Sequence, residues 1–241
     1  MLDQAYKNFE VLVLDNASTD KTVELLRNIQ KADSRLVIIP SKINHGPYHG
    51  LNLLLDKARG TYVAINDHDD IWHPEKLHKQ ITFLEKHEAF LGCGSAIINW
   101  YEKYDRYFYR SQQKEAAIAW HTSLVFRNSG YRYDTTVKIA TDFYFMKNIL
   151  CKNTKQIYNF QEPLVLRRIF KESNNLSGKW MKKMSLSEII RLNVGVMDKL
   201  ALLNRRTFPQ EWVEWALVKI FADNVPVEYI KYAKYYDQEV K

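Results

Sequence analysis

Residues 62–77 read YVAINDHDDIWHPEKL, a stretch that runs from an apolar segment into a cluster of acids. The apolar, partly β-branched start predicts a buried strand, and Pro74 stands where proline favours the first turn of a helix. Asp67, Asp69 and Asp70 lie between them, and carboxylates this close repel one another unless a cation compensates. Hard oxygen ligands suit Mg²⁺, Mn²⁺ or Ca²⁺. Two interpretations stay open: a metal site beyond the carboxyl end of a strand, or a solvated loop in which Asp70 caps the helix.

The composition is that of a folded protein with a sizeable core. The chain has 241 residues, of which 46% are hydrophobic and 26% are charged. Its two cysteines, Cys93 and Cys151, show no metal-ligand spacing, which indicates buried thiols in a reducing compartment. The sequence has no signal peptide and no apolar run that could cross a membrane, so we expect a cytoplasmic protein.

The charge of the chain is unevenly distributed. Residues 1–100 carry a net charge of −2 and residues 101–241 a net charge of +9, within a total of +7. The basic half favours an anionic partner such as phosphate, a membrane surface or nucleic acid. Because no four lysines or arginines follow one another, we expect no nucleic-acid partner.

Strands and helices alternate over the first 90 residues. Strands are predicted over 9–14, 35–39 and 62–66, and an amphipathic helical pattern follows each of them. This alternation is typical of an α/β fold with a mostly parallel sheet and helices on both faces.

The pattern changes after residue 90. We expect a strand over 90–99, a hairpin or a surface flap over 100–110, a short strand over 123–126 and a helix that begins at Thr141 or Asp142. The tail predicts aromatic-rich amphipathic helices, for which two interpretations stay open: packing on their own domain, or contact with a membrane interface.

Four segments, in order, resemble family 2 of the glycosyltransferases, the inverting family of GT-A fold. They are residues 14–20 (LDNASTD), residues 44–52 (NHGPYHGLN), residues 67–77 (DHDDIWHPEKL) and residues 141–144 (TDFY). The segment 121–127 (HTSLVFR) is also similar to the acceptor-side strand of that family. The QxxRW signature of processive polysaccharide synthases is absent, which favours transfer of single sugars.

The resemblance implies a role for each motif residue. Asp142 would be the catalytic base, Asp69 with Asp67 would hold Mn²⁺ or Mg²⁺, and His121, Arg167 and Arg168 would lie on the acceptor side. The residues implied in nucleotide binding are Asp15, Asn16, Asn44, Asp67 and His68. For His121, contact with metal or phosphate and a structural role both stay open.

The resemblance also implies a domain plan and partners. Residues 1–178 would form the GT-A domain, with a nucleotide and metal half over 1–90 and an acceptor half over 91–178, followed by a helical extension over 179–241. The expected partners are a nucleotide-sugar donor and a glycan or lipid-linked acceptor, with membrane contact through the C-terminal helices at the inner face of the membrane.

The chain departs from the family at its start. Residues 4–10 (QAYKNFE) are similar to the segment just before the second strand of the family, so the first strand and most of the first helix are lacking. That strand is central in the family sheet, and its loss leaves unpaired backbone groups there. Two rivals to a working glycosyltransferase therefore remain: a non-catalytic member that binds a sugar nucleotide or a partner, and a metal-dependent nucleotidyltransferase. The chain has no glycine-rich phosphate loop with a following lysine, which speaks against the second.

Overall fold

The computed structural model describes residues 1–102, 105–137 and 140–169, together with Val225. The chain divides into two compact units, Met1–Ile97 with Arg110–Arg167, and Ile98–Tyr109 with the chain from Arg168 onward. The expected helical extension over 179–241 lies outside the described residues apart from Val225, and the predicted domain boundary at 178 stays a prediction.

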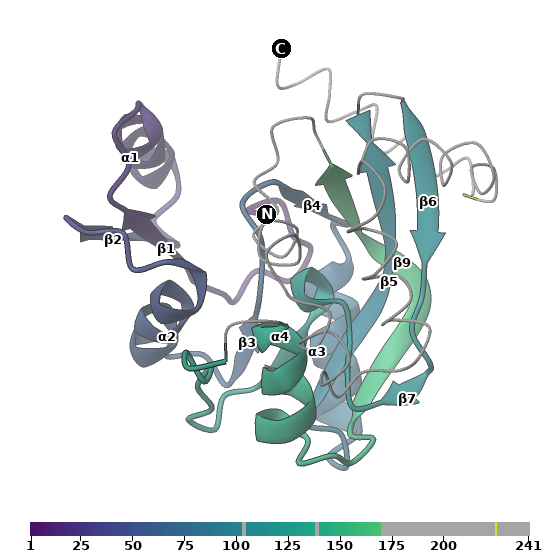
Figure 1. Cartoon of the computed structure of the whole chain (residues 1–241). Coiled ribbons are helices and arrows are strands. Elements are labelled where there is room, and N and C mark those ends of the chain that lie inside the picture. The colour runs from purple at the N-terminus through teal and green to yellow at the C-terminus, as the bar shows by residue number, and fades with distance from the viewer. Residues whose placement is uncertain (103–104, 138–139, 170–224, 226–241) are drawn as a thin grey trace, which may run out of the picture. The chain divides into compact units, whose positions relative to one another are not determined.

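The first unit holds most of the described secondary structure (Figure 1). The helices are α1 (Thr22–Ala32), α2 (Pro47–Lys57), α3 (Lys76–Lys86), the short 3₁₀-helix η2 (His121–Ser123), and α4 (Thr141–Tyr144), which continues as the π-helix η3 (Phe145–Leu150). The strands are β1 (Val11–Asn16), β2 (Leu36–Ser41), β3 (Tyr62–Ala64), β4 (Asp70–Trp72), β5 (Gly92–Tyr101), β6 (Arg106–Arg110), β7 (Glu115–Ala116), β8 (Val125–Arg127) and β9 (Ile157–Ile169).

The strands form two sheets. β1 and β2 pair in parallel, with Val11 opposite Leu36 and Asn16 opposite Ser41. The larger sheet has seven strands in the order β3-β8-β5-β9-β4, with β6 added to β5 and β7 added to β9. The α/β character expected from the alternating pattern is confirmed.

The expectation of a mostly parallel sheet is wrong for the larger sheet. The pairs β3–β8, β5–β8, β4–β9 and β7–β9 are all antiparallel. Parallel neighbours need a long crossover, usually through a helix, whereas antiparallel neighbours can be joined by short connections. After α3, α4 with η3 connects two strands of this sheet, β8 and β9, through a helix, and residues 100–110 contain the end of β5 and all of β6, which pairs with β5.

The two sheets are separate at the point where the sequence predicts a lacking central strand. Within the described residues, β1 pairs only with β2, and β3 pairs only with β8. One edge of β1 and one edge of β3 therefore lack a strand partner among the described residues, and the lacking strand stays a prediction.

The helices bury very different amounts of side chain. α3 buries five residues against the larger sheet, and Leu84 among them is fully inaccessible. α1 buries none, and its Leu25 and Ile29 are 61% and 44% exposed. α2 approaches β1 closely because Gly50 has no side chain; a Cβ there would lie 2.9 Å from Cδ2 of Leu14. The larger sheet and α3 therefore hold most of the core.

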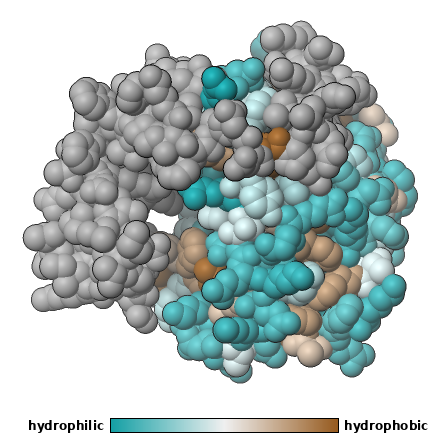
Figure 2. All heavy atoms as spheres, turned by 90° about the vertical axis from the view of Figure 1, so that its right-hand side faces the viewer, coloured by the Kyte–Doolittle hydropathy of each residue, from teal (hydrophilic) through white to brown (hydrophobic). Residues whose placement is uncertain are grey.

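The described surface is largely polar on the face drawn in Figure 2. Apolar side chains on that face form small groups among hydrophilic ones. Scattered apolar groups of this kind are normal on folded proteins.

Candidate active site

The predicted metal-binding carboxylates lie in the turn between β3 and β4. Ile65 is buried and extends the line of β3, because its N–H donates to the backbone carbonyl just before β8 (3.1 Å). The turn closes where the N–H of Asp70 donates to the carbonyl of Asp67 (3.1 Å). Asp67 and His68 are exposed and Asp69 is half-buried. The sequence did not predict β4, which begins at Asp70.

Asp70 is the third carboxylate of the turn, and its pKa depends on burial and on the charges around it. Burial raises the pKa of Asp70 to about 7, a hydrogen bond from Thr122 lowers it, and the negative charges of Asp67 and Asp69 raise it again. The positive charge of Arg167, which is paired with Asp70 in the β4–β9 register, also lowers this pKa. The turn therefore concentrates negative charge, as the sequence predicted.

Gln4 supports the segment that connects β4 to α3. Its side-chain amide donates to the carbonyl of His73 (2.9 Å), and its side-chain oxygen accepts the N–H of Leu77 in the first turn of α3 (3.0 Å). The N–H of Ala5 donates to the carbonyl of Pro74 (2.9 Å). Gln4 is only 2% exposed, so these bonds fix the start of α3 in a buried place.

A buried lysine lies next to the same segment. Nζ of Lys76 is 4.0 Å from the ring centroid of Trp72 and has no hydrogen-bond partner among the residues that the structure describes. Burial lowers the pKa of Lys76 to about 7, and the nearby Cys93 partly opposes this. The burial of Lys76 could not be predicted from the sequence, because a lysine in the first turn of a helix usually faces solvent.

The two predicted nucleotide-binding asparagines contact each other: Asn16 ends β1, and Asn44 lies in the loop that follows β2. The amide of Asn16 donates to the side-chain oxygen of Asn44 (3.1 Å), and its own oxygen accepts the N–H of His45 (2.8 Å). Asn44 also accepts the N–H of Gly46 (2.8 Å), whose φ of 72° is open mainly to glycine. The structure thus brings Asn16 and Asn44 into one polar cluster.

Asp15 shapes the turn that follows β1. It is 7% exposed, and its carboxylate accepts the N–H of Ser18 (3.0 Å). Ala17, between them, has a φ of 66°. Such a left-handed conformation is uncommon for a residue with a side chain and often marks a functional turn.

The predicted base stands in the first turn of a helix. α4 begins at Thr141, as expected, and Asp142 is half-buried in its first turn, where the helix dipole favours a carboxylate. Ala140 just before it has a φ of 51°. The helix then widens into η3, and π-helical turns are frequent at functional sites.

Two tyrosines are affected by both the predicted base and a predicted metal ligand. Burial raises the pKa of Tyr48 above its usual range, as do the negative charges of Asp142 and Asp67, while a hydrogen bond from the N–H of Asp142 lowers it. Burial also raises the pKa of Tyr133 well above its usual value, and Asp142 and Asp67 add to this. The pKa of each tyrosine is therefore raised by both Asp67 and Asp142, although these two carboxylates come from distant segments of the chain.

Tyr133 is held on three sides. Asn52 of α2 donates to its carbonyl (2.9 Å) and accepts its N–H (2.8 Å). The ring stacks on Phe145 of η3 with centroids 4.1 Å apart, and the hydroxyl lies 2.8 Å from Nε2 of His121. From the sequence, Asn52 was identified only as part of a motif. No functional role was predicted for Tyr48, Tyr133, Gln4 or Lys76. Tyr48 lies inside that motif, whereas Tyr133 stands in a loop without periodicity.

The two predicted acceptor-side arginines are separated. Arg167 lies opposite Asp70 in the β4–β9 register. Arg168 forms an ion pair with Glu102 (2.7 Å) and lies over the ring of Trp100, with 5.7 Å between its Cζ atom and the ring centroid. Neighbouring residues on a strand point to opposite faces of the sheet, so only one of them can face any given site.

The residues of the turn suit a cation that is shared with a phosphate ligand. Within the described residues, no group of three or more His, Cys, Asp or Glu side chains could hold a metal ion by itself. Asp67 and Asp69 offer hard oxygen ligands, and the side-chain oxygen of Asn66 is buried without a hydrogen-bond partner among these residues. Mg²⁺ is commonly bound by one or two carboxylates plus substrate phosphates, and the donor set fits that mode.

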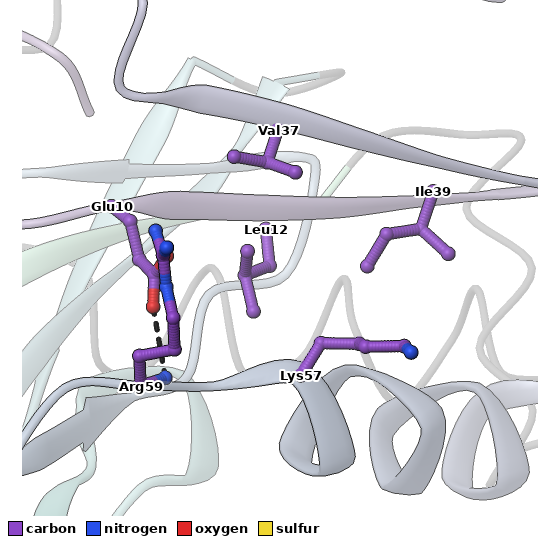
Figure 3. Close-up of a pocket in the computed structure, with 6 residues that line it drawn as sticks. All are labelled: Glu10, Leu12, Val37, Ile39, Lys57 and Arg59. Carbon is purple, nitrogen blue, oxygen red and sulfur yellow. Dashed lines mark hydrogen bonds and ion pairs between the residues drawn. The ribbon is translucent and has the colours of Figure 1, made fainter.

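A separate cavity lies between the β1–β2 sheet and the end of α2 (Figure 3). Its volume is about 260 Å³, and an ion pair of 2.6 Å between Arg59 and Glu10 stands at one end. The other lining residues are Leu12, Val37, Ile39 and Lys57. None of the predicted site residues lines this cavity, so the predicted chemistry remains with the carboxylates.

No helix within the described part of the chain is long and apolar enough to cross a membrane.

Comparison with known proteins gives one family match. A family-wide sequence profile described as Glycosyl transferase family 2 matches residues 1–170. The chain is 35% identical over 99 residues to the putative teichuronic acid biosynthesis glycosyltransferase TuaG of Bacillus subtilis, which is 41% of this chain and 39% of TuaG. It is 35% identical over 97 residues to WfaP of Escherichia coli, named as a UDP-Glc:alpha-D-GlcNAc-diphosphoundecaprenol beta-1,3-glucosyltransferase, which is 40% of this chain and 38% of WfaP.

Solved structures share the fold. The chain is similar to S. aureus TarS 1-349, solved in complex with UDP-GlcNAc, with a TM-score of 0.57 and 16% identity over 85% of this chain and 64% of that chain. It is also similar to the mannosyltransferase PcManGT from Pyrobaculum calidifontis in complex with GDP-Man and Mn2+, with a TM-score of 0.55 and 18% identity over 84% of this chain and 61% of that chain. The expected GT-A fold is confirmed.

Proposed function

Because the chain belongs to glycosyl transferase family 2, we propose that it transfers a sugar, with inversion, from a nucleotide-sugar donor to a glycan or lipid-linked acceptor. The observation that carries this proposal is the meeting of two carboxylates around the same tyrosines. Asp67 of the β3–β4 turn and Asp142 of α4 both raise the pKa of Tyr48 and of Tyr133. The transfer needs a donor-side and an acceptor-side carboxylate near one site, and the influence of Asp67 and Asp142 on the same two tyrosines supports this assignment.

Asp142 is the proposed general base. It accepts the proton of the acceptor hydroxyl while that oxygen forms its bond to the anomeric carbon and the bond from this carbon to the diphosphate oxygen breaks. The nucleoside diphosphate leaves with the electrons of the broken bond. Asp142 is half-buried in the first turn of α4, where the helix dipole favours a carboxylate.

The donor would bind across the ends of β1 and the β3–β4 turn. Asp15, Asn16 and Asn44 form the proposed nucleotide side, with Asp67 and His68 nearer the diphosphate. Asp69 and Asp67 would hold Mn²⁺ or Mg²⁺, which when bound would neutralise the charge of the leaving diphosphate. PcManGT was solved with Mn2+, which supports this choice of metal.

Relatives support the class of acceptor. WfaP is named for a diphosphoundecaprenol-linked sugar, and TuaG is named for the biosynthesis of teichuronic acid. We therefore propose a role in making a cell-surface polysaccharide, on the cytoplasmic side of the membrane. The proposed membrane contact through the C-terminal helices falls on residues outside the described part of the chain.

The test begins with ligand binding. Thermal unfolding of the chain is measured against UDP, GDP and their sugar derivatives, with and without Mn²⁺. A ligand at a hundred times its Kd adds about 2.7 kcal/mol to the stability of a folded state, which gives a clear rise in the midpoint. We expect a Mn²⁺-dependent rise with one nucleotide that Asp69→Asn removes.

The second step separates binding from turnover. Asp142→Asn should abolish transfer and leave the nucleotide-induced rise intact, whereas Asp56→Asn, an exposed carboxylate of α2 that pairs with Arg132, should change neither. Loss of binding with residual turnover in Asp142→Asn would overturn its assignment as the base. Nucleotide binding without any turnover in the unmodified chain would favour a non-catalytic member of the family. Release of pyrophosphate from a nucleoside triphosphate would favour a nucleotidyltransferase.

A further inference from the structure

The contact between His121 and Tyr133 narrows the role of the histidine. We propose that Tyr133 is a positioning residue that keeps a hydrogen on Nδ1 of His121, so that His121 donates to an oxygen of the donor diphosphate and does not ligate the metal. The inference rests on the proposed function, and it chooses between the metal and the phosphate contacts that the sequence left open. Nε2 of His121 lies 2.8 Å from the hydroxyl oxygen of Tyr133.

The tyrosine is the donor in this hydrogen bond. Tyr133 is 3% exposed, and burial together with the charge of Asp142 raises its pKa, so the hydroxyl keeps its proton at any working pH. Within the described residues, His121 is the hydrogen-bond partner of this hydroxyl. A buried hydroxyl hydrogen without an acceptor is costly, so it points at Nε2.

The position of the second ring hydrogen follows from this. In a neutral imidazole one nitrogen accepts and the other carries the hydrogen, so an accepting Nε2 places the hydrogen on Nδ1. Nδ1 is therefore the hydrogen-bond donor of this ring.

A donor nitrogen suits an anion and excludes a metal. Metal ligation uses the lone pair of a neutral imidazole nitrogen, and Nε2 is already engaged while Nδ1 carries a hydrogen. A hydrogen bond to a phosphate oxygen has a charged acceptor, which makes it shorter and stronger than a neutral one. The carboxylates Asp67 and Asp69 therefore remain the metal candidates, and His121 belongs with the diphosphate.

Tyr133 is rigid enough to impose this geometry. Asn52 binds both its backbone N–H and its carbonyl, and its ring stacks on Phe145 at an interplanar angle of 24°. Phe145 stands about one helical turn after Asp142. The same tyrosine thus orients His121 and packs against the helix that carries the proposed base.

The tautomer is measured directly by NMR of the full chain labelled with ¹⁵N-histidine, using long-range proton–nitrogen correlations. The His121→Asn variant assigns the signal. We expect a protonated Nδ1 in the unmodified chain and a mixture of tautomers in Tyr133→Phe, which keeps the ring and the backbone bonds. Tyr107→Phe removes a hydroxyl from another buried tyrosine, which lies 3.3 Å from a carboxylate oxygen of Asp105, and should leave the His121 signal unchanged. An unprotonated Nδ1 in the unmodified chain would overturn the inference.

The ligand is tested with Mn²⁺ followed by electron paramagnetic resonance, and with UDP and GDP. His121→Leu should leave Mn²⁺ affinity within about twofold and weaken nucleoside diphosphate binding about tenfold or more, which is one strong hydrogen bond. His121→Asn, which retains a donor near the position of Nδ1, should recover part of that loss. A tenfold fall in Mn²⁺ affinity in His121→Leu, or unchanged diphosphate binding, would overturn the inference alone. If the unmodified chain binds neither nucleotide, the proposed function fails and the diphosphate ligand fails with it.

Discussion

Replacing Lys76 by methionine should stabilise the protein, and by an amount that depends on pH. Lys76 is fully buried over Trp72, and burial lowers its pKa from 10.5 to about 7. That difference corresponds to about 5 kcal/mol against the charged form. The Trp72 ring offsets up to about 2 kcal/mol of this through its attraction for a cation. At pH 6, where the amine is charged in both states, we expect Lys76→Met to gain about 2–4 kcal/mol, because methionine fills a similar volume without charge.

The pH dependence has a definite direction. Between the lowered pKa in the folded state and 10.5 in the unfolded state, the unfolded chain binds more protons, so the stability of the unmodified protein rises with pH. The slope approaches about 1.4 kcal/mol for each pH unit. The advantage of Lys76→Met should therefore shrink by about 1–3 kcal/mol between pH 6 and pH 9. Effects of titrating groups that do not interact with Lys76 are present in both proteins and cancel in the difference. Cys93 does interact with Lys76, but burial raises the pKa of its thiol to about 12, so the thiol stays neutral from pH 6 to pH 9.

Urea unfolding followed by tryptophan fluorescence at pH 6, 7, 8 and 9 measures this difference, provided that the urea dependence is the same in both proteins. Lys79→Met is the matched control on α3: it removes an ion pair to Glu162 of 2.7 Å between side chains that are each 34% exposed. We expect that control to lose about 1 kcal/mol or less. A difference between Lys76→Met and the unmodified chain that stays constant from pH 6 to pH 9 would refute the reasoning, as would a large destabilisation at pH 6.

Two further substitutions test how the site is supported. Asn52→Ala removes two hydrogen bonds to the backbone of Tyr133 and should cost about 2–4 kcal/mol in urea unfolding, whereas Asn52→Asp keeps the acceptor and should cost less; equal costs would contradict the two-bond account. Gly46→Ala meets no atom within 4 Å but forces a side chain into a φ of 72°, so its cost of about 1–3 kcal/mol is conformational. Gly130→Ala, with a φ of 77° and equally open space, should cost a similar amount of stability but leave nucleotide binding unchanged. Gly46→Ala should weaken nucleotide binding, because it displaces Asn44. An equal fall in nucleotide affinity in both variants would contradict the role of Gly46 in placing Asn44.

The elements with strong local patterns were predictable. The strand and helix pattern up to residue 90, the hairpin over 100–110 and the start of α4 at Thr141 follow from periodicity, turn residues and caps. β4 escaped prediction because three residues carry no period, and its pairing with β9 is a long-range contact. The antiparallel larger sheet escaped because the direction of pairing depends on connections rather than on the strands themselves.

The site was predictable only as far as its motifs reach. Asn16 ends β1 and Asn44 lies in the loop that follows β2, and the two hydrogen-bond because parallel strands bring their carboxyl ends to one edge. Arg167 and Arg168 are adjacent in sequence yet cannot serve one site, since strand geometry sends them to opposite faces. Tyr133 and Gln4 act through tertiary contacts with α2 and α3, and no local pattern announces such contacts.

The two sides of the proposed donor site rest on unequal supports. The β3–β4 turn is followed by a segment with buried contacts. Gln4 hydrogen-bonds to both His73 and Leu77, and Lys76 packs on Trp72. The asparagine side rests on the β1–β2 pair, whose helix α1 buries no residue. Local stability follows buried apolar contact, so the asparagine side should open more readily than the turn.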